Sequence, residues 1–174
     1  MTHLYADTDS HTSVILAQVI LRELYKREPE LIAANMYNPP PAEAQTLLLI
    51  GDKVVNGAPS DVQYPFQLDL GEQWKLLTGL PFVFAMWMMP ADKANPELAA
   101  LLAEARRRGG EMTDHLVEKY AQEKRWPADL ARRYFTEYLQ YAVTPRCRQG
   151  IEKFFELAAK QSLLTLHRKI QYMT

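Results

Sequence analysis

The chain is poor in the residues that build covalent and metal-linked structure. Cys147 is the only cysteine among 174 residues, which excludes an intramolecular disulfide and any C-x-x-C site and fits a reducing compartment. No base is paired with it in the sequence, so we interpret Cys147 as a structural thiol rather than a nucleophile. The four histidines show no i, i+4 pairing, and the sequence therefore gives little support to a zinc site.

The chain also lacks an excess of charge and any long hydrophobic run. Its 20 basic and 21 acidic residues nearly cancel, which removes the electrostatic footprint of a nucleic-acid-binding protein. The longest apolar run, residues 80–89, is too short to cross a bilayer, and the amino terminus has no basic region followed by an apolar one. We therefore expect a cytoplasmic globular protein that binds neither nucleic acid nor a membrane.

Motifs for nucleotide and nucleophile chemistry are absent as well. There is no G-x-G-x-x-G, no Walker loop and no G-x-S-x-G nucleophile elbow. The one basic run, residues 106–108, closes a predicted helix before Gly109, where cations complement the helix dipole. We favour a solvated helix end over a phosphate patch there. These absences leave cofactor-free chemistry, or binding alone.

The first half of the chain has the alternating pattern of an α/β fold. Residues 4–6 are a short strand candidate, and a helix with a wide apolar face begins near Thr12 or Ser13. Residues 46–50 are an uninterrupted apolar run, which is typical of a parallel strand covered on both faces. A short predicted helix around Trp74 then leads, through Pro81, into a predicted buried strand over residues 82–87.

After Pro90 the pattern becomes almost entirely helical. Four amphipathic segments follow, and the last opens with Thr144 as N-cap and Pro145 at the first helical position. The sequence therefore predicts two parts. Residues 1–95 form an α/β lobe with ligand-facing turns, and residues 96–174 form a helical region whose apolar stripes need a surface to cover.

Three hydroxyl side chains gather where the first predicted helix begins. Ser10, Thr12 and Ser13, with His11 between them, lie beside the free N–H groups and the positive end of the helix macrodipole, which favour an anion. A carboxylate is the natural ligand. The alternative is an ordinary N-cap, for which one hydroxyl suffices. His11 is a neighbour of such a ligand in this interpretation and has no role as a base.

Gly51 and Asp52 directly follow the predicted buried strand over residues 46–50. Open α/β sheets bind their ligands beyond the carboxyl ends of the strands, so Asp52 is a candidate to orient a substrate hydroxyl. Alternatively, Asp52 caps the next segment or forms a structural ion pair. Trp74 is more typical of a core residue than of a cofactor platform.

Several of these segments together resemble a known family. Residues 69–87, DLGEQWKLLTGLPFVFAMW, the Ser-x-Thr-Ser element at residues 10–13 and the run LLIGD at residues 48–52 resemble the MqnA/MqnD family of menaquinone-biosynthesis enzymes of the futalosine pathway. The resemblance extends from about Tyr5 to about Leu164. It implies an α/β fold like that of type 2 periplasmic binding proteins, in which this chain supplies the second lobe and the carboxyl-terminal helices.

The resemblance also implies an activity. The run FVFA after Gly79-Leu80-Pro81 is similar to the chorismate dehydratase branch, a carbon–oxygen lyase that converts chorismate to 3-[(1-carboxyvinyl)oxy]benzoate by loss of water, without metal, nucleotide or other cofactor. The substrate-binding residues implied are Ser10, His11, Thr12, Ser13, Gly51 and Asp52, and no catalytic residue is assigned. The alternatives are a non-catalytic module that binds a small carboxylate and an enzyme similar to 1,4-dihydroxy-6-naphthoate synthase.

Two departures from the family pattern affect these expectations. Lys53-Val54-Val55 replaces small apolar residues after Gly51-Asp52, and most of the family's first lobe has no counterpart in this sequence. The missing first lobe predicts that the chain forms a homodimer through its apolar helices or pairs with a separately encoded first-lobe partner.

Overall fold

The computed structural model describes residues 1–7, 9–35, 41–59, 63–164 and 170–172. Strands and helices alternate in the first part of this described chain, and helices follow. The elements are β1 (His3–Asp7), α1 (His11–Tyr25), β2 (Glu30–Ala34), β3 (Leu47–Leu48), α2 (Asp52–Asn56), α3 (Leu70–Thr78), η1 (Ala91–Lys93), α4 (Pro96–Glu111), α5 (Thr113–Tyr120), α6 (Ala128–Arg133), the π-helical η2 (Tyr134–Tyr138) and α7 (Pro145–Lys160).

The chain forms two compact units. The first comprises Met1–Phe84 and Thr144–His167, and the second comprises Ala85–Val143 and Arg168–Thr174. The sequence pattern placed every residue after 95 in one helical region, whereas α7 packs with the α/β unit. Amphipathicity alone cannot make this assignment, because it marks the face that a helix buries and not its partner.

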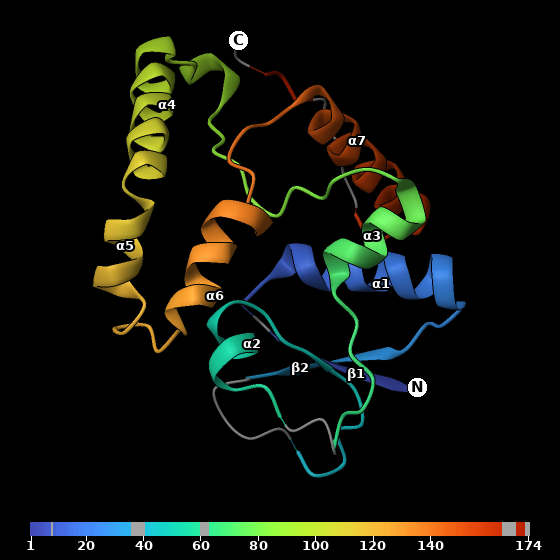
Figure 1. Cartoon of the computed structure of the whole chain (residues 1–174). Helices are drawn as coiled ribbons and strands as arrows, with labels where there is room; N and C mark the ends of the chain where they lie inside the picture. Colours follow the sequence, from blue (N-terminus) through green and yellow to red (C-terminus); the bar gives the residue numbers. More distant parts are fainter. Residues whose placement is uncertain (8, 36–40, 60–62, 165–169, 173–174) are drawn as a thin grey trace. The chain divides into compact units, whose positions relative to one another are not determined.

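The first unit contains a parallel sheet with strand order β2-β1-β3. Tyr5 of the central strand pairs with Ile32 on one side and with Leu47 on the other. The fold is thus mixed α/β with a small parallel sheet, as the alternating pattern predicts. Helix α1 connects β1 to β2 and lies between these strands and helices α3 and α7 (Figure 1).

Helix α1 is buried on two sides. Ala17 and Leu21 pack with Leu4, Ala6 and Leu48 of the sheet. The opposite side of the helix contributes to a second cluster, in which all members are at most 8% exposed: Leu16, Val19, Ile20, Trp74, Phe154, Leu157 and Ala158. The wide apolar face in the sequence therefore corresponds to a helix that forms a middle layer.

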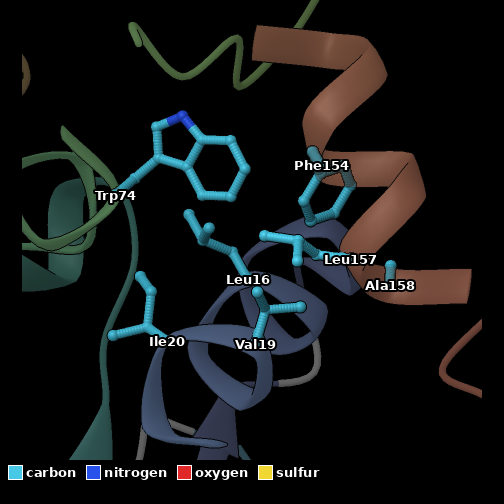
Figure 2. Close-up of a cluster of buried hydrophobic side chains, with 7 residues drawn as sticks. All are labelled: Leu16, Val19, Ile20, Trp74, Phe154, Leu157 and Ala158. Carbon is cyan, nitrogen blue, oxygen red and sulfur yellow. The ribbon is translucent and has the colours of Figure 1, made fainter. Parts of the chain in front are cut away.

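Trp74 is central to this second cluster. Its indole lies over Leu16 of α1 and faces Phe154 of α7 (Figure 2), and it is fully buried. The ring meets Phe82 and Phe154 edge-on, with centroids 5.4 and 6.2 Å away. The structural role expected for Trp74 agrees with this packing. Asp69 caps the same helix, since its carboxylate accepts a hydrogen bond from the Glu72 N–H at 2.8 Å.

The prediction of a strand over residues 82–87 is wrong. These residues form no strand: Phe82 packs against helices α3 and α7 instead of the sheet, while Phe84 and Trp87 are largely exposed. Phe82 contacts Trp74, Phe84 and Phe154 edge-on. The strand predicted over residues 46–50 is shorter than expected, Leu47–Leu48. Strand β2 is not predicted from the sequence, because Glu30, Ala33 and Ala34 have low strand propensity.

The second unit has its own small core. Val117, Ala121 and Ala131 are buried there, with Trp126 and Phe135 packed against them. On α4, Arg107 and Arg108 pair with Glu104, which fits a solvated helix rather than a phosphate site, but the helix does not end before Gly109 as predicted: it continues to Glu111. No helix among the described residues is both long and apolar enough to span a membrane.

Helix α7 approaches the chain at Pro81 closely enough to require glycine. A Cβ built on Gly150 would lie 2.2 Å from the carbonyl oxygen of Pro81, a distance at which the backbone must move. Arg146, one turn earlier, donates a hydrogen bond to the Gly79 carbonyl at 2.6 Å. The glycine therefore lets α7 seat directly on the segment that follows α3.

We expect Gly150→Ala to lower the free energy of unfolding by about 1 to 3 kcal/mol, because the new methyl group forces α7 away from Pro81. Urea unfolding followed by circular dichroism measures this change. Gly109→Ala in α4 is the matched control, since nothing lies within 4 Å of its built Cβ. The control should gain about 0.5 to 1 kcal/mol from helix propensity. Equal effects of the two substitutions would contradict the prediction.

Candidate functional site

The sheet brings the two ligand-facing turns predicted from the sequence to one edge. Strands β1 and β3 are parallel neighbours, so the turns after Asp7 and Leu48 both leave the carboxyl edge of the sheet. The chain continues from β1 through α1 to β2 on one side, while β3 lies on the other side. Strand order therefore reverses here, which is where open α/β sheets bind ligands. We call Asp7, residues 9–13 and residues 51–53 the switch-point site.

Two of the predicted hydroxyls fix the start of α1. Ser10 is the N-cap, and its Oγ accepts a hydrogen bond from the Ser13 N–H at 3.1 Å. The same hydroxyl donates to Ser13 Oγ at 3.0 Å. Ser13 is buried. Ser10 is therefore the N-cap of α1, and Ser13 in the first turn is its hydrogen-bond partner.

His11 and Thr12 lie at the accessible part of the same turn. His11 is exposed and Thr12 is half-buried. The backbone N–H groups of His11 and Thr12 are the first two of the helix. They have no acceptor inside the helix, and they make no hydrogen bond to any other described residue. Helix α1 has 15 residues, so these N–H groups stand at the positive end of a substantial macrodipole. This end of the helix can accept an anion.

The second turn presents Gly51 and Asp52, both exposed. Gly51 is the N-cap residue of α2 with φ 61° and ψ −142°, a conformation that L side chains rarely adopt. Asp52 is the first residue of α2 and lies in its first turn. The glycine thus allows the chain to turn sharply out of β3, so that α2 begins at the sheet edge.

A lysine ties the two turns together. The Lys53 Nζ on α2 lies 2.9 and 2.8 Å from the two carboxylate oxygens of Asp7, and 2.6 Å from Oδ2 of Asp9. Asp7 is 1% exposed. The Asp9 N–H also donates to Asp7 Oδ1 at 3.2 Å. The end of β1, the approach to α1 and the start of α2 therefore share one ion cluster.

The cluster keeps Lys53 protonated. Desolvation lowers the pKa of the Lys53 ammonium, but hydrogen bonds and charge attraction from Asp7 and Asp9 outweigh it and raise that pKa from its ordinary 10.5 to about 12. The ammonium is consequently a fixed positive charge at neutral pH. It can hold an anion or a leaving oxygen, but it cannot act as a general base.

This cluster does not follow from any local pattern in the sequence, where Lys53 is only a departure from the family pattern and Asp7 and Asp9 belong to no candidate site. The available signal is a charged residue at the end of one buried strand, Asp7, and another shortly after the neighbouring strand, Lys53, because a charge taken out of water needs a partner of opposite sign. The pair is separated by 46 residues, so no local spacing reveals it.

Cys147 belongs to the start of α7 and not to this site. It is buried, its N–H donates to Thr144 Oγ1 at 3.2 Å, and the Thr144 hydroxyl lies 3.2 Å from its Sγ. Within the described part of the chain, no three His, Cys, Asp or Glu side chains are grouped so that they could hold a metal ion. The switch-point site itself presents N–H groups, hydroxyls, carboxylates and one ammonium.

We expect Lys53→Met to lower the free energy of unfolding at neutral pH, because the buried Asp7 carboxylate loses the ammonium. The folded pKa of Lys53 is raised, so its contribution is complete below the ordinary value of 10.5 and is lost as pH rises through about 12. The stability difference between the two chains should therefore be constant from about pH 7 to 10 and shrink above that range.

Urea unfolding at a series of pH values measures this difference. Lys75→Met is the control, because Lys75 is exposed on α3 and its substitution should leave stability nearly unchanged. A Lys53→Met chain as stable as the unmodified protein at neutral pH would show that the ion cluster does not contribute to folding.

Comparison with known families gives one assignment for the whole arrangement. A family model described as menaquinone biosynthesis matches residues 2–160. The match runs from β1 to the end of α7, and it includes both turns of the switch-point site and the helices that position them. On this evidence the chain belongs to the menaquinone biosynthesis family.

Proposed function

We propose that this protein is an enzyme of the chorismate dehydratase kind, which removes water from chorismate to give 3-[(1-carboxyvinyl)oxy]benzoate in menaquinone biosynthesis by the futalosine pathway. The observation that carries the proposal is the convergence of two turns at the β1/β3 switch point, where the start of α1 offers unused N–H groups. The family match supports the menaquinone role, and the resemblance of residues 69–87 supports the dehydratase branch.

The chemistry of this reaction suits a site without a resident cofactor. One ring proton and one hydroxyl group leave together as water, and the ring becomes aromatic, which supplies the driving force. The protein has to hold the carboxylates of the substrate, orient the breaking C–H and C–O bonds and exclude solvent. In our proposal the His11 and Thr12 N–H groups and the Thr12 hydroxyl hold one carboxylate. Asp52 orients the ring hydroxyl.

We further propose that the two-lobed architecture of type 2 periplasmic binding proteins provides the rest of the cleft. The α/β unit described above is then the second lobe, and the opposite wall comes either from a partner that supplies the first lobe or from a second copy of this chain. The switch-point turns support this arrangement because His11, Gly51 and Asp52 are exposed at the sheet edge.

A non-catalytic carboxylate-binding module is the second candidate. The raised pKa of Lys53 favours it, because the one buried amine of the site is held protonated and no general base is assigned in its place. This alternative shares the ligand class and the contacts of the first proposal. It differs only in whether product forms.

Incubation of the purified chain with chorismate, alone and with a candidate first-lobe partner, tests the enzyme proposal. We expect the aromatic product to appear, detected by its absorbance and mass. Saturable binding without product would identify the binding module, and formation of 1,4-dihydroxy-6-naphthoate from that branch's substrate would identify the other branch. No binding and no product in either mixture would reject both proposals.

Thr12→Val tests the contribution of the first turn, because it keeps the shape of the side chain and removes the hydroxyl. We expect chorismate binding to weaken about tenfold, the size of one hydrogen bond to a charged group. Calorimetric titration measures the affinity, and circular dichroism checks the fold. Thr136→Val is the control, since the Thr136 hydroxyl donates to the Arg132 carbonyl within the helical unit. Equal affinity of both variants would show that the Thr12 hydroxyl does not contact the ligand.

A further inference from the structure

The two carboxylates around Lys53 are held very differently. Asp7 is almost completely buried and places both oxygens on the ammonium. Asp9 places one oxygen on it at 2.6 Å, and its side chain is 51% exposed. Asp7 therefore neutralises Lys53 in the protein interior, whereas Asp9 reaches the same ammonium from the solvent side.

Asp9 also stands directly beside the start of α1. It precedes the N-cap residue Ser10, so its carboxylate is tied to the backbone that leads into the His11 and Thr12 N–H groups. Its hydrogen bond to Lys53 places a negative charge next to the helix end that can accept an anion. Asp9 thus links the Lys53 ammonium to the start of α1, and its carboxylate screens both positive groups.

We propose that Asp9 is a built-in competitor for the ligand carboxylate, and that an organic acid binds at the start of α1 by taking the place of Asp9 on the Lys53 ammonium. This inference rests on the proposed function and extends it, because it makes Lys53 a binding residue and Asp9 a determinant of affinity. The exchange keeps the charge balance of the cluster. One carboxylate leaves the ammonium for solvent and another replaces it.

The energetics favour Asp9 as the group that leaves. An ion pair with an exposed partner contributes little to stability, so Asp9 can rotate into water at small cost. Asp7 cannot leave in the same way, since a buried charge without its partner is strongly destabilising. Like charges repel at short range, so Asp9 also opposes the approach of any second carboxylate while it remains in place.

Asp9→Asn tests the inference, because it preserves the shape of the side chain and removes its charge. We expect the full-length variant to bind chorismate, and benzoate as the simplest aromatic carboxylate, about tenfold more tightly than the unmodified chain, since the competing contact and the repulsion both disappear. Isothermal titration calorimetry at fixed ionic strength measures both affinities. Asp9→Ala should tighten binding in the same direction and serves as the second variant.

Two controls separate a local effect from a general effect of charge. Glu43→Gln removes one negative charge from an exposed residue of the same unit and should leave the affinity unchanged. In a background with Asp7→Asn and Lys53→Gln, which removes the buried pair together, Asp9→Asn should tighten binding much less, because only the charge repulsion is then relieved. Equal gains from Glu43→Gln, or an Asp9 effect of undiminished size without Lys53, would overturn the inference.

The outcome also distinguishes this inference from the proposed function. If the unmodified chain binds or converts chorismate and Asp9→Asn binds with equal or lower affinity, the competitor role fails and the proposed function stands. If neither chain binds any carboxylate, both fail. Tighter binding by both Asp9 variants, dependent on Lys53 and absent from Glu43→Gln, supports the competitor role.

Discussion

Helix α1 has apolar side chains around most of its circumference, and water must be removed from two sides of it. The small sheet covers Ala17 and Leu21, and α3 and α7 cover Leu16, Val19 and Ile20 on the other side. Each buried aliphatic side chain contributes roughly 1.5 to 3 kcal/mol. The position of α1 also sets the position of its amino terminus. The candidate site is therefore a consequence of how the core is layered.

The site combines two requirements that oppose each other. A pocket for an organic acid needs positive potential, yet an isolated ammonium held in the interior is costly. Asp7 compensates the Lys53 ammonium in the interior, and in our proposal a ligand carboxylate replaces Asp9 on the same ammonium. The pKa of Lys53 is raised because attraction from the two carboxylates outweighs the desolvation of the ammonium. Membership of the menaquinone biosynthesis family places this arrangement among proteins of quinone metabolism.

Local patterns predicted the elements whose signals are local. The strand over residues 4–6, a hydroxyl cap at the start of the first helix and the helix around Trp74 follow from alternation, hydroxyl placement and spacing. Contacts between distant segments did not follow. Lys53 meets Asp7 across 46 residues, and the packing of Phe82 on Trp74 and Phe154 turned an apparent strand into an aromatic connection. Short-range periodicity shows which side chains of a segment are buried, whereas the tertiary structure decides which other segment they pack against.

The place of α7 in the chain has a consequence for biosynthesis. Arg22 of α1 donates a hydrogen bond to the Gln161 carbonyl at 3.1 Å, across 139 residues, and Ala85–Val143 of the second unit is synthesised between the two. On the ribosome, α1 remains without α7 until the residues up to Lys160 have been synthesised, although α3 can cover part of the same face earlier. The helices of the second unit make mostly short-range contacts and can form earlier. Premature termination before Thr144 would leave a nascent chain with an uncovered hydrophobic surface, a substrate for chaperones and proteases.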